Sequence, residues 1–538
     1  MSPHITTVPR PALAILTALA LSLPGPAIAG PASASPSPAS PAAPVAASAA
    51  LSAASSAAPS SPTRLGPNAH STLTVQNVGT ENGSFLAAVA RHASTAPPID
   101  RIAQSIFPGG AFRDALPSAH GLPPGDYAAR ITADRPTAAV ARLSWAGGRR
   151  VMYRDVEASK DVILPLVLAE HHGRSSRIAI QNTASDRPTL VKVTLWPSVG
   201  TAPASEKLYN MAPGSANVID LGRDWTAPPF FGSARLVSND APIAVTSVVA
   251  IETSAKAAFA VAGVPAERAA RTLYAPLMRK YFVDFDGRTR STGFAITNPS
   301  SEPVQVRATY RGDSPACWDF TTSEGPVAVP GHGVIDIYPP QNALLPNNCQ
   351  GAAVLEADGP ILAVVNDAVD VGIQSAVYPA LGADEAAKAV AVPEFMLDYG
   401  PDRLYSTATV MNVSAVTATI DFAYRREGDA ERLPCGAPCR YVVPPYESIS
   451  YGRTQLSPTN RGTRGSGLVT SDQPVIVVVS ETSDAGTVDA ASYVGIPLDA
   501  PRPGGTATPA PQARYVPWLA GGEPGGTRAQ VYLPIGWR

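Results

Sequence analysis

Charged side chains are scarce in this chain. Lysine and arginine number 41 and aspartate and glutamate 43 among 538 residues, a charged share of 16% with a net charge of -2. Proteins that bind nucleic acid carry a basic face, and acidic interaction tails carry runs of one sign. The composition argues against both, so we expect no nucleic-acid partner.

Long apolar runs are also lacking after the N-terminus, so no transmembrane span is expected in the mature chain. Residues 12–23 (ALAILTALALSL) have the length of a signal-peptide core. They follow Arg10, and Ala27-Ile28-Ala29 gives a small-x-small cleavage pattern. We expect residues 1–29 to be a signal peptide and the protein to be secreted or held at the cell surface. An uncleaved membrane anchor is the alternative.

Residues 30–64 contain almost nothing but alanine, proline and serine. Such a segment has too little apolar surface to offset the entropy lost on ordering. We therefore expect a disordered linker over 30–64.

Cysteine is absent from the first 316 residues; the four cysteines are Cys317, Cys349, Cys435 and Cys439. An even count in an exported chain indicates disulfides, and three pairings are open. We expect Cys317–Cys349 and Cys435–Cys439, because this pairing keeps each bridge within one repeat unit. Zinc is disfavoured, because the spacing in CGAPC does not suit a zinc knuckle and no histidine is near.

Familiar catalytic motifs are missing: the chain has no GxSxG, SxxK, HExxH or phosphate-binding loop. The seven histidines are scattered, and only His171 and His172 adjoin. Neighbours on an extended chain point to opposite sides, so this pair is a poor chelate. We predict a non-enzyme without a cofactor, with a secreted hydrolase of unrecognised type as an alternative.

Proline (56) and glycine (43) are abundant, which favours many short strands joined by turns over long helices. Four similar strands end in an asparagine: LTVQN, IAIQN, FAITN and ATVMN, at Asn77, Asn182, Asn298 and Asn412. Recurrence at roughly 110 residues is too long for a solenoid and suits four modules, each with its own core. We interpret the asparagines as structural, bonding to the turn that follows.

Two further anchors keep step with the asparagines. One is a proline turn before an alternating strand, at Pro108, Pro213, Pro330 and Pro444. The other is Asp-x-Pro before a β-branched run, at residues 134–136, 240–242, 358–360 and 472–474. Aspartate there is expected to cap its own backbone in a tight turn between two strands. Together the anchors predict an all-β protein built of β-sandwiches.

The pattern resembles the tandem immunoglobulin-like modules of exported and surface-attached bacterial proteins. The predicted organisation is listed in order: signal peptide 1–29, linker 30–64, divergent module 65–160, modules 161–270, 271–386 and 387–500, and linker with truncated hairpin 501–538. The resemblance implies a spacer, an adhesin or a carbohydrate-binding accessory protein, with a glycan or a cell-surface protein as partner. Fold alone does not choose among these.

An apolar strand containing one proline opens three modules, at 163–168, 274–282 and 391–397, and module 1 lacks it. The tail holds two such phrases, YVPWLA (515–520) and VYLPIGW (531–537). A two-stranded unit alone could not bury them. We expect the tail to pack on module 4, since the connection is short, with completion of another module or another chain as the alternative.

Two short motifs are candidate binding sites. Asp284 and Asp286 mimic the start of a calcium loop, although the distal glutamate is missing, and a polar turn is the preferred interpretation. Arg311-Gly312-Asp313 resembles an integrin-binding tripeptide; we place it at a tip between two strands, where glycine and aspartate are expected anyway. An adhesion tip is the alternative.

Four tryptophans spread over different units are a weak indication of sugar binding, with core packing as the preferred interpretation. They are Trp196, Trp225, Trp318 and Trp518.

The first prediction concerns export. Residues 1–29 should be missing from the secreted protein, because the cleavage pattern ends at Ala29. N-terminal sequencing of secreted material should begin near Gly30, and an exported form that retains Met1 would contradict the assignment.

Overall fold

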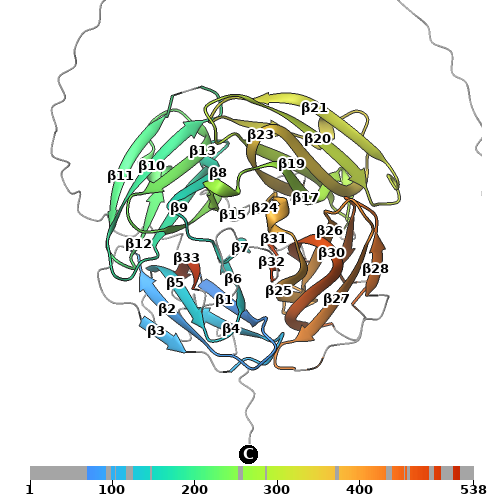
Figure 1. The fold of residues 1–538 in the computed structure, drawn as a ribbon, viewed down its shortest axis with the longest axis horizontal. Helices are drawn as coiled ribbons and strands as arrows, with labels where there is room; N and C mark the ends of the chain where they lie inside the picture. The colour runs from blue at the N-terminus through green and yellow to red at the C-terminus, as the bar shows by residue number, and fades with distance from the viewer. Residues whose placement is uncertain are drawn as a thin grey trace, which may run out of the picture. The chain divides into compact units, whose positions relative to one another are not determined.

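Strands bounded by proline, glycine, aspartate and asparagine form four β-sandwich modules that surround one centre (Figure 1). The chain divides into two units, Met1–Ala58 and Pro59–Arg538, and the modules belong to the second. The computed structural model describes the following residues: 70–92, 99–102, 105–116, 125–145, 148–200, 202–251, 258–284, 287–369, 375–429, 431, 439–453, 455–456, 461–483, 490–498 and 513–521. The predicted signal peptide and linker lie outside them.

Module 1 contains the first seven strands and the last. These are β1 (His70–Asn77), β2 (Phe85–Arg91), β3 (Ile99–Ile102), β4 (Ala111–Leu116), β5 (Gly125–Ala133), β6 (Thr137–Ser144), β7 (Arg150–Arg154) and β33 (Arg514–Gly521). Module 2 follows directly. It consists of β8 (Asp161–Ala169), β9 (Arg174–Asn182), β10 (Thr189–Pro197), β11 (Ser205–Met211), β12 (Ala216–Asp220), α1 (Leu221–Asp224), β13 (Phe230–Ser238), β14 (Ile243–Ile251), β15 (Ala258–Ala262), β16 (Val264–Pro265) and η1 (Ala266–Arg268).

Modules 3 and 4 have the same plan. Module 3 consists of β17 (Ala270–Lys280), β18 (Phe282–Val283), β19 (Thr289–Thr297), β20 (Val304–Gly312), β21 (Thr321–Val329), β22 (Val334–Ile337), η2 (Pro339–Gln341), β23 (Cys349–Val369), β24 (Ser375–Pro379) and η3 (Ala383–Glu385). Module 4 consists of β25 (Ala387–Leu397), β26 (Leu404–Asn412), β27 (Ala418–Arg426), β28 (Arg440–Val443), β29 (Ser448–Tyr451), β30 (Thr463–Ser483), β31 (Ala491–Val494) and β32 (Ile496–Pro497).

Each module pairs a first sheet with a second sheet. In module 2 the first sheet runs β11-β10-β13-β8-β16 and the second β12-β9-β14-β15, and the pairings of the other modules repeat this order. Strands β10 and β20 of the first sheet alternate between buried and exposed residues over their first halves. Strands of the second sheet, such as β1 and β6, are buried almost throughout. When the residues on both faces of a strand are buried, both faces of its sheet must be covered by other parts of the protein.

The second face is covered by the preceding module. Each of the four large apolar cores joins one module to residues from the second sheet of the next, and module 4 joins module 1 in the same way. The last strand of each second sheet, which we call the axial strand, lies near the centre of Figure 1. These axial strands are β7, β15, β24 and β31, and each contacts the next around the centre, β31 contacting β7. The modules therefore close into a ring.

Strand β33 completes module 1, which corrects the expectation that the tail packs on module 4. It pairs with β5 from Arg514 to Gly521, in the place that β8, β17 and β25 take in their own modules. In Figure 1 it is the red strand among the blue ones. Trp518 is fully buried as predicted, but in the core of module 1. The second phrase, 531–537, lies outside the described residues.

We call β33, β8, β17 and β25 the opening strands. Each breaks its pairing at its proline, and in β33 the break lies between Val516 and Leu519. Proline has no N–H to donate, so a bulge at this position is expected. In modules 3 and 4 the freed carbonyl accepts a tyrosine hydroxyl from the axial strand: Tyr378 Oη donates to Leu277 O (2.7 Å) and Tyr493 Oη to Glu394 O (2.6 Å). In module 1 Tyr153 donates to the carbonyl of Trp518.

The three repeated sequence anchors meet at one hydrogen-bonded corner in modules 1, 2 and 4, and in module 3, where Pro299 follows the asparagine, the first two do. In module 4, Asn412 Nδ2 donates to Val416 O (2.8 Å) and Val443 O (3.1 Å), while its Oδ1 accepts from Ser414 N (3.0 Å). The other three asparagines make the equivalent bonds. All four are at most 1% exposed, so the structural interpretation is confirmed.

The Asp-x-Pro anchor works differently from the prediction. It does not join paired strands, because it carries the chain from the first sheet to the second, and in modules 3 and 4 it lies inside the continuous strands β23 and β30. In modules 1, 3 and 4 the carboxylate accepts from a backbone N–H of a neighbouring segment. Asp472 Oδ1 accepts from Thr419 N (2.8 Å) of the adjacent strand β27, and Asp134 Oδ1 accepts from Ser84 N (2.7 Å).

The second prediction concerns this corner. Replacing Asn412 by alanine should lower the free energy of unfolding by roughly 3 kcal/mol, because buried carbonyls and an N–H lose their partners. Urea unfolding measures the loss. Asn210 is exposed in β11 and is the matched control, with an expected change from its alanine variant below about 0.5 kcal/mol. Equal losses for the two variants would contradict a structural role of the corner.

The third prediction concerns two buried groups that touch β33. Burial raises the pKa of Asp126 from 3.8 to about 6 and lowers that of His92 from 6.5 to about 4. A raised carboxyl pKa gives stability that is lost as pH rises from about 4 to about 6, whereas a lowered histidine pKa gives stability that is lost as pH falls through the same range. The two slopes oppose each other in the wild type.

Single variants should therefore separate the slopes. From pH 4 to 6, His92→Gln should lose stability relative to wild type and Asp126→Asn should gain it, each by at most about 3 kcal/mol. Urea unfolding at several pH values tests the signs. A shift of both variants in the same direction would contradict the assignment.

Candidate functional site

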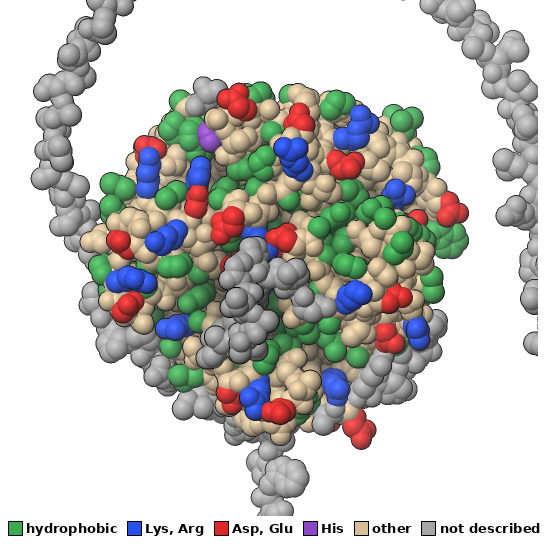
Figure 2. Space-filling view, viewed as in Figure 1, with side chains coloured by type: hydrophobic (Ala, Val, Ile, Leu, Met, Phe, Trp, Pro, Cys, Tyr) green, Lys and Arg blue, Asp and Glu red, His purple; other side chains and the backbone are tan. Residues whose placement is uncertain are grey.

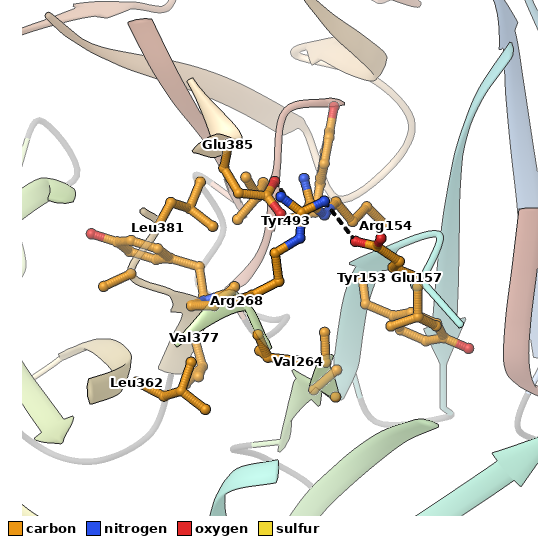
Figure 3. A pocket seen from close by; sticks show the side chains of 18 of the residues that line it. Tyr153, Arg154, Glu157, Val264, Arg268, Leu362, Val377, Leu381, Glu385 and Tyr493 are labelled. Atoms are coloured by element: carbon orange, nitrogen blue, oxygen red, sulfur yellow. Dashed lines mark hydrogen bonds and ion pairs between the residues drawn. The ribbon is translucent and has the colours of Figure 1, made fainter. Parts of the chain in front are cut away.

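The axial cavity lies where the four modules meet. It has a volume of about 750 Å³, including the part open to solvent, and residues of all four modules line it. Its walls come from the axial strands and from the segments that follow them toward the next opening strand. Figure 3 shows side chains from these elements around it, with Val264, Leu362, Val377 and Leu381 on its apolar side.

The polar side of the cavity is formed by ion pairs between residues of different modules. Arg154 of β7 pairs with Glu385 of η3 (Nη2–Oε2 2.7 Å), and Arg268 of η1 pairs with Asp384 and with Glu157 (Nη2–Oε2 2.9 Å). Burial lowers the pKa of Arg268, but the neighbouring carboxylates raise it further, above the ordinary arginine value. These guanidiniums are therefore fixed positive charges beside an apolar space.

This arrangement suits binding better than acid–base chemistry. Ligand cavities are commonly apolar with a few placed polar groups. The carboxylates beside the cavity, Glu157, Asp384 and Glu385, are paired with arginines. Because Glu385, Asp384 and Glu157 already neutralise the two guanidiniums, the feature left for a ligand is the apolar wall.

A second unusual cluster is buried between modules 4 and 1. Glu394 is 1% exposed and stands where the other opening strands have Leu166, Leu277 and Trp518. Its carboxylate pairs with Arg142 (2.8 Å) and accepts from Thr74 Oγ1 (3.1 Å), and Arg142 also pairs with Glu481. Burial raises the pKa of Glu394, but three guanidiniums, led by that of Arg142, lower it below its usual range. The cluster is a buried ion-pair network.

The calcium candidate lies only partly within the described residues. The Asp284 carboxylate pairs with Arg290 (2.9 Å), and Asp286 lies outside the described residues. Among the described residues no three His, Cys, Asp or Glu side chains gather as metal ligands. The loop begins as a polar turn, in which Gly287 N donates to Asp284 O (2.8 Å).

The tripeptide Arg311-Gly312-Asp313 is not at an exposed tip. Arg311 and Gly312 end strand β20, and the turn follows them. The Arg311 guanidinium lies over the ring of Tyr446 (5.6 Å) and Asp313 Oδ2 accepts from Ser448 Oγ (2.8 Å), both in module 4. An integrin-type contact would compete with these bonds, so we do not carry the adhesion interpretation further.

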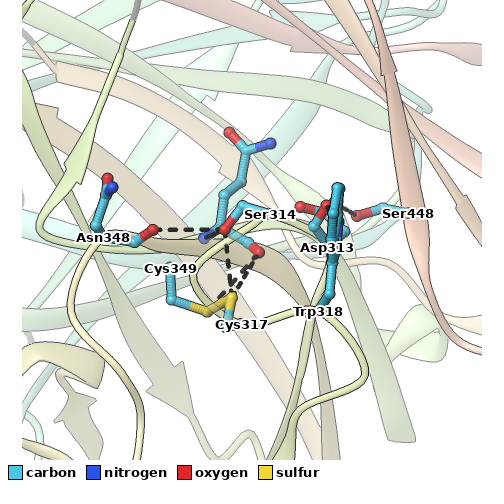
Figure 4. Close-up of a disulfide and its surroundings, with 8 residues drawn as sticks. Asp313, Ser314, Cys317, Trp318, Asn348, Cys349 and Ser448 are labelled. Atoms are coloured by element: carbon cyan, nitrogen blue, oxygen red, sulfur yellow. Dashed lines mark hydrogen bonds between the residues drawn. A yellow bond between two sulfur atoms is a disulfide. The ribbon is translucent and has the colours of Figure 1, made fainter. Parts of the chain in front are cut away.

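The disulfide Cys317–Cys349 is present, as predicted, with an S–S distance of 2.08 Å (Figure 4). It ties the turn after β20 to the start of β23, beside Ser314, whose Oγ accepts from Gln350 N (2.9 Å). Cys439 is disulfide-bonded, whereas Cys435 lies outside the described residues.

The remaining candidates are dispersed. His171 and His172 contact each other edge-on at 4.3 Å, and His171 stacks on Phe231. Trp196 stacks on His332 (4.1 Å), Trp225 Nε1 donates to Pro228 O (2.8 Å), and Trp318 is 65% exposed. A lone exposed indole does not make a sugar platform. On the face of Figure 2, basic and acidic side chains intermingle over the described residues.

Sequence reasoning missed the cavity residues and the axial tyrosines. Tyr153, Tyr378 and Tyr493 occupy one register position, opposite Ala141, Val365 and Val479 of the neighbouring strand. Extending the internal alignment to the last strand of each module would have revealed them. Internal alignment would not have revealed Arg154 and Arg268, because arginine does not recur at their positions in the other modules.

No protein-family model and no curated protein matches the chain. Among solved structures, the native conformation of E. coli alpha-2-macroglobulin, seen by cryo-EM, aligns at 11% identity with a TM-score of 0.12. The alignment covers 84% of this chain and 29% of that chain, so this chain spans under a third of that protein. A likeness this weak carries no argument. No helix in the described part is long and apolar enough to span a membrane.

The fourth prediction concerns Glu394. Replacing it by leucine, the residue of modules 2 and 3, should lower the free energy of unfolding by about 3–5 kcal/mol, because Arg142 loses a buried partner. The double variant Glu394→Leu, Arg142→Met should recover part of the loss. Urea unfolding of both variants tests this, and a single variant as stable as wild type would show that the pair contributes nothing.

Proposed function

We propose that this chain is an exported, non-catalytic binding protein that holds a small, largely apolar ligand in its axial cavity. The observation that carries the proposal is that all four modules contribute walls to this cavity. The paired side chains of Arg154 and Arg268 close one side, and Val264, Leu362 and Val377 supply the apolar surface.

The ring supports binding over a spacer role. A spacer gains length from modules placed end to end, whereas here the first and last described strands pair at His70 and Gly521. The separation between the two ends of the array is then a single strand spacing. A closed ring adds no reach, but it does enclose a shared space.

The fifth prediction tests the cavity with N-phenyl-1-naphthylamine, an uncharged fluorescent probe with apolar rings. The wild-type protein should bind about one probe per chain with enhanced fluorescence. Val264→Trp fills the cavity and should weaken binding at least about tenfold, because the large side chain takes the space of the probe.

Val237→Trp is the matched control, since Val237 is 41% exposed on β13 and does not line the cavity. It should bind as wild type does. Urea unfolding confirms that both variants are folded. Equal binding by wild type and Val264→Trp, or no binding by wild type, would overturn the proposed site.

A further inference from the structure

The place of β33 in module 1 is a groove built to hold a strand. One edge is β5, which pairs with β33 along its length, and β1 meets it at His70. Strands β9 and β14 of module 2 contact β33 as well. The apolar floor takes Val516, Trp518 and Leu519, which are at most 1% exposed.

Polar groups of module 1 recognise atoms of β33 along this groove. Asp126 Oδ1 accepts from Trp518 Nε1 (3.1 Å), His92 Nε2 bonds to Pro517 O (2.9 Å), and Ser71 Oγ accepts from Ala520 N (2.6 Å). At the other end Arg514 pairs with Asp155 (2.7 Å). Module 1 therefore makes specific polar contacts with the bulge, the indole and both ends of β33.

The chain connection between module 4 and β33 does not require that β33 occupy module 1 of its own chain rather than that of another copy. The other opening strands lead within a few residues into their own second sheet, as β8 does into β9. Strand β33 instead joins module 1 only by non-covalent contacts, and residues 499–512 separate it from module 4. A segment of that length can span up to about 45 Å when extended.

We propose that the groove of module 1 also accepts β33 from a second copy of this chain, so that two copies exchange their last described strands. Exchange of an identical element keeps every contact of the closed ring and needs no new surface. Its extent follows from concentration. With an effective intramolecular concentration on the order of 1 mM, about one groove in ten would hold a partner's strand at about 0.1 mM chain. This inference does not depend on the axial cavity.

The exchange can be trapped with cysteines placed on opposite strands. Arg130 and Tyr515 face each other in the pairing of β5 with β33, at a separation that a disulfide can bridge. One preparation of the full chain carries Arg130→Cys and another carries Tyr515→Cys. The two are mixed, partly unfolded in urea, refolded and oxidised. Neither chain alone contains the pair, so a cross-link between different chains reports a strand seated in a partner's groove.

Two controls calibrate the yield. A chain with both substitutions gives the intrachain bond and sets the full yield. Mixing Arg130→Cys with Leu208→Cys measures random collision, because Leu208 is 64% exposed on the edge strand β11 of module 2. We expect the Arg130–Tyr515 heterodimer to exceed this collision background about tenfold and to rise with chain concentration. A yield at the background level at every concentration would overturn the proposal.

A peptide supplies a second readout that does not depend on refolded variants. A peptide of residues 513–521 present during refolding should reduce the heterodimer, because it fills the groove. The same peptide with Trp518→Ile should compete less, since isoleucine has no N–H for Asp126. Isoleucine is also the matching residue of the second tail phrase, at Ile535. Equal competition by both peptides would contradict recognition of the indole.

Discussion

The pairing of β33 with β5 is the constraint on which the rest of the ring depends. It gives module 1 the opening strand that its own sequence lacks, and it supplies the surface against which β9 and β14 of module 2 pack. Each second sheet is buried on both faces only because a preceding module covers it. The axial cavity exists because this covering runs through all four modules and returns to the first.

Within a module, the buried asparagine plays the corresponding local role. Its amide joins the end of one strand to the proline turn that follows about thirty residues later, and in module 4 the next residue, Val413, donates to Pro474 O (3.2 Å). The three sequence anchors recur together because hydrogen bonds join them at one corner of the module. Replacing the buried asparagine leaves buried polar groups without partners, which is costly.

Departures from the repeat mark the places where modules differ in role. Glu394 replaces an apolar residue and forms the ion-pair network between modules 4 and 1, where the ring closes. Val261 lies opposite Ser247, at the position that tyrosine takes in the other axial strands, so module 2 lacks the hydroxyl. Arg268 and Glu385 lie in short helical turns between modules and carry charge to the cavity. The charged part of the candidate site is therefore made from residues that do not repeat.

The sequence by itself determined the all-β class, the four repeats, the structural asparagines and the Cys317–Cys349 bridge, because turn chemistry and strand pattern act over short distances. It also showed that module 1 lacks an opening strand and that the tail holds a segment of the same kind. The relation to immunoglobulin-like modules and the binding role stay predictions. Only the tertiary structure decided that β33 joins module 1, that Arg311 and Asp313 face module 4, and that Arg154 and Arg268 meet at a cavity. These facts depend on contacts between residues hundreds of positions apart. Local sequence patterns do not predict such contacts, because these residues become neighbours only when the ring closes.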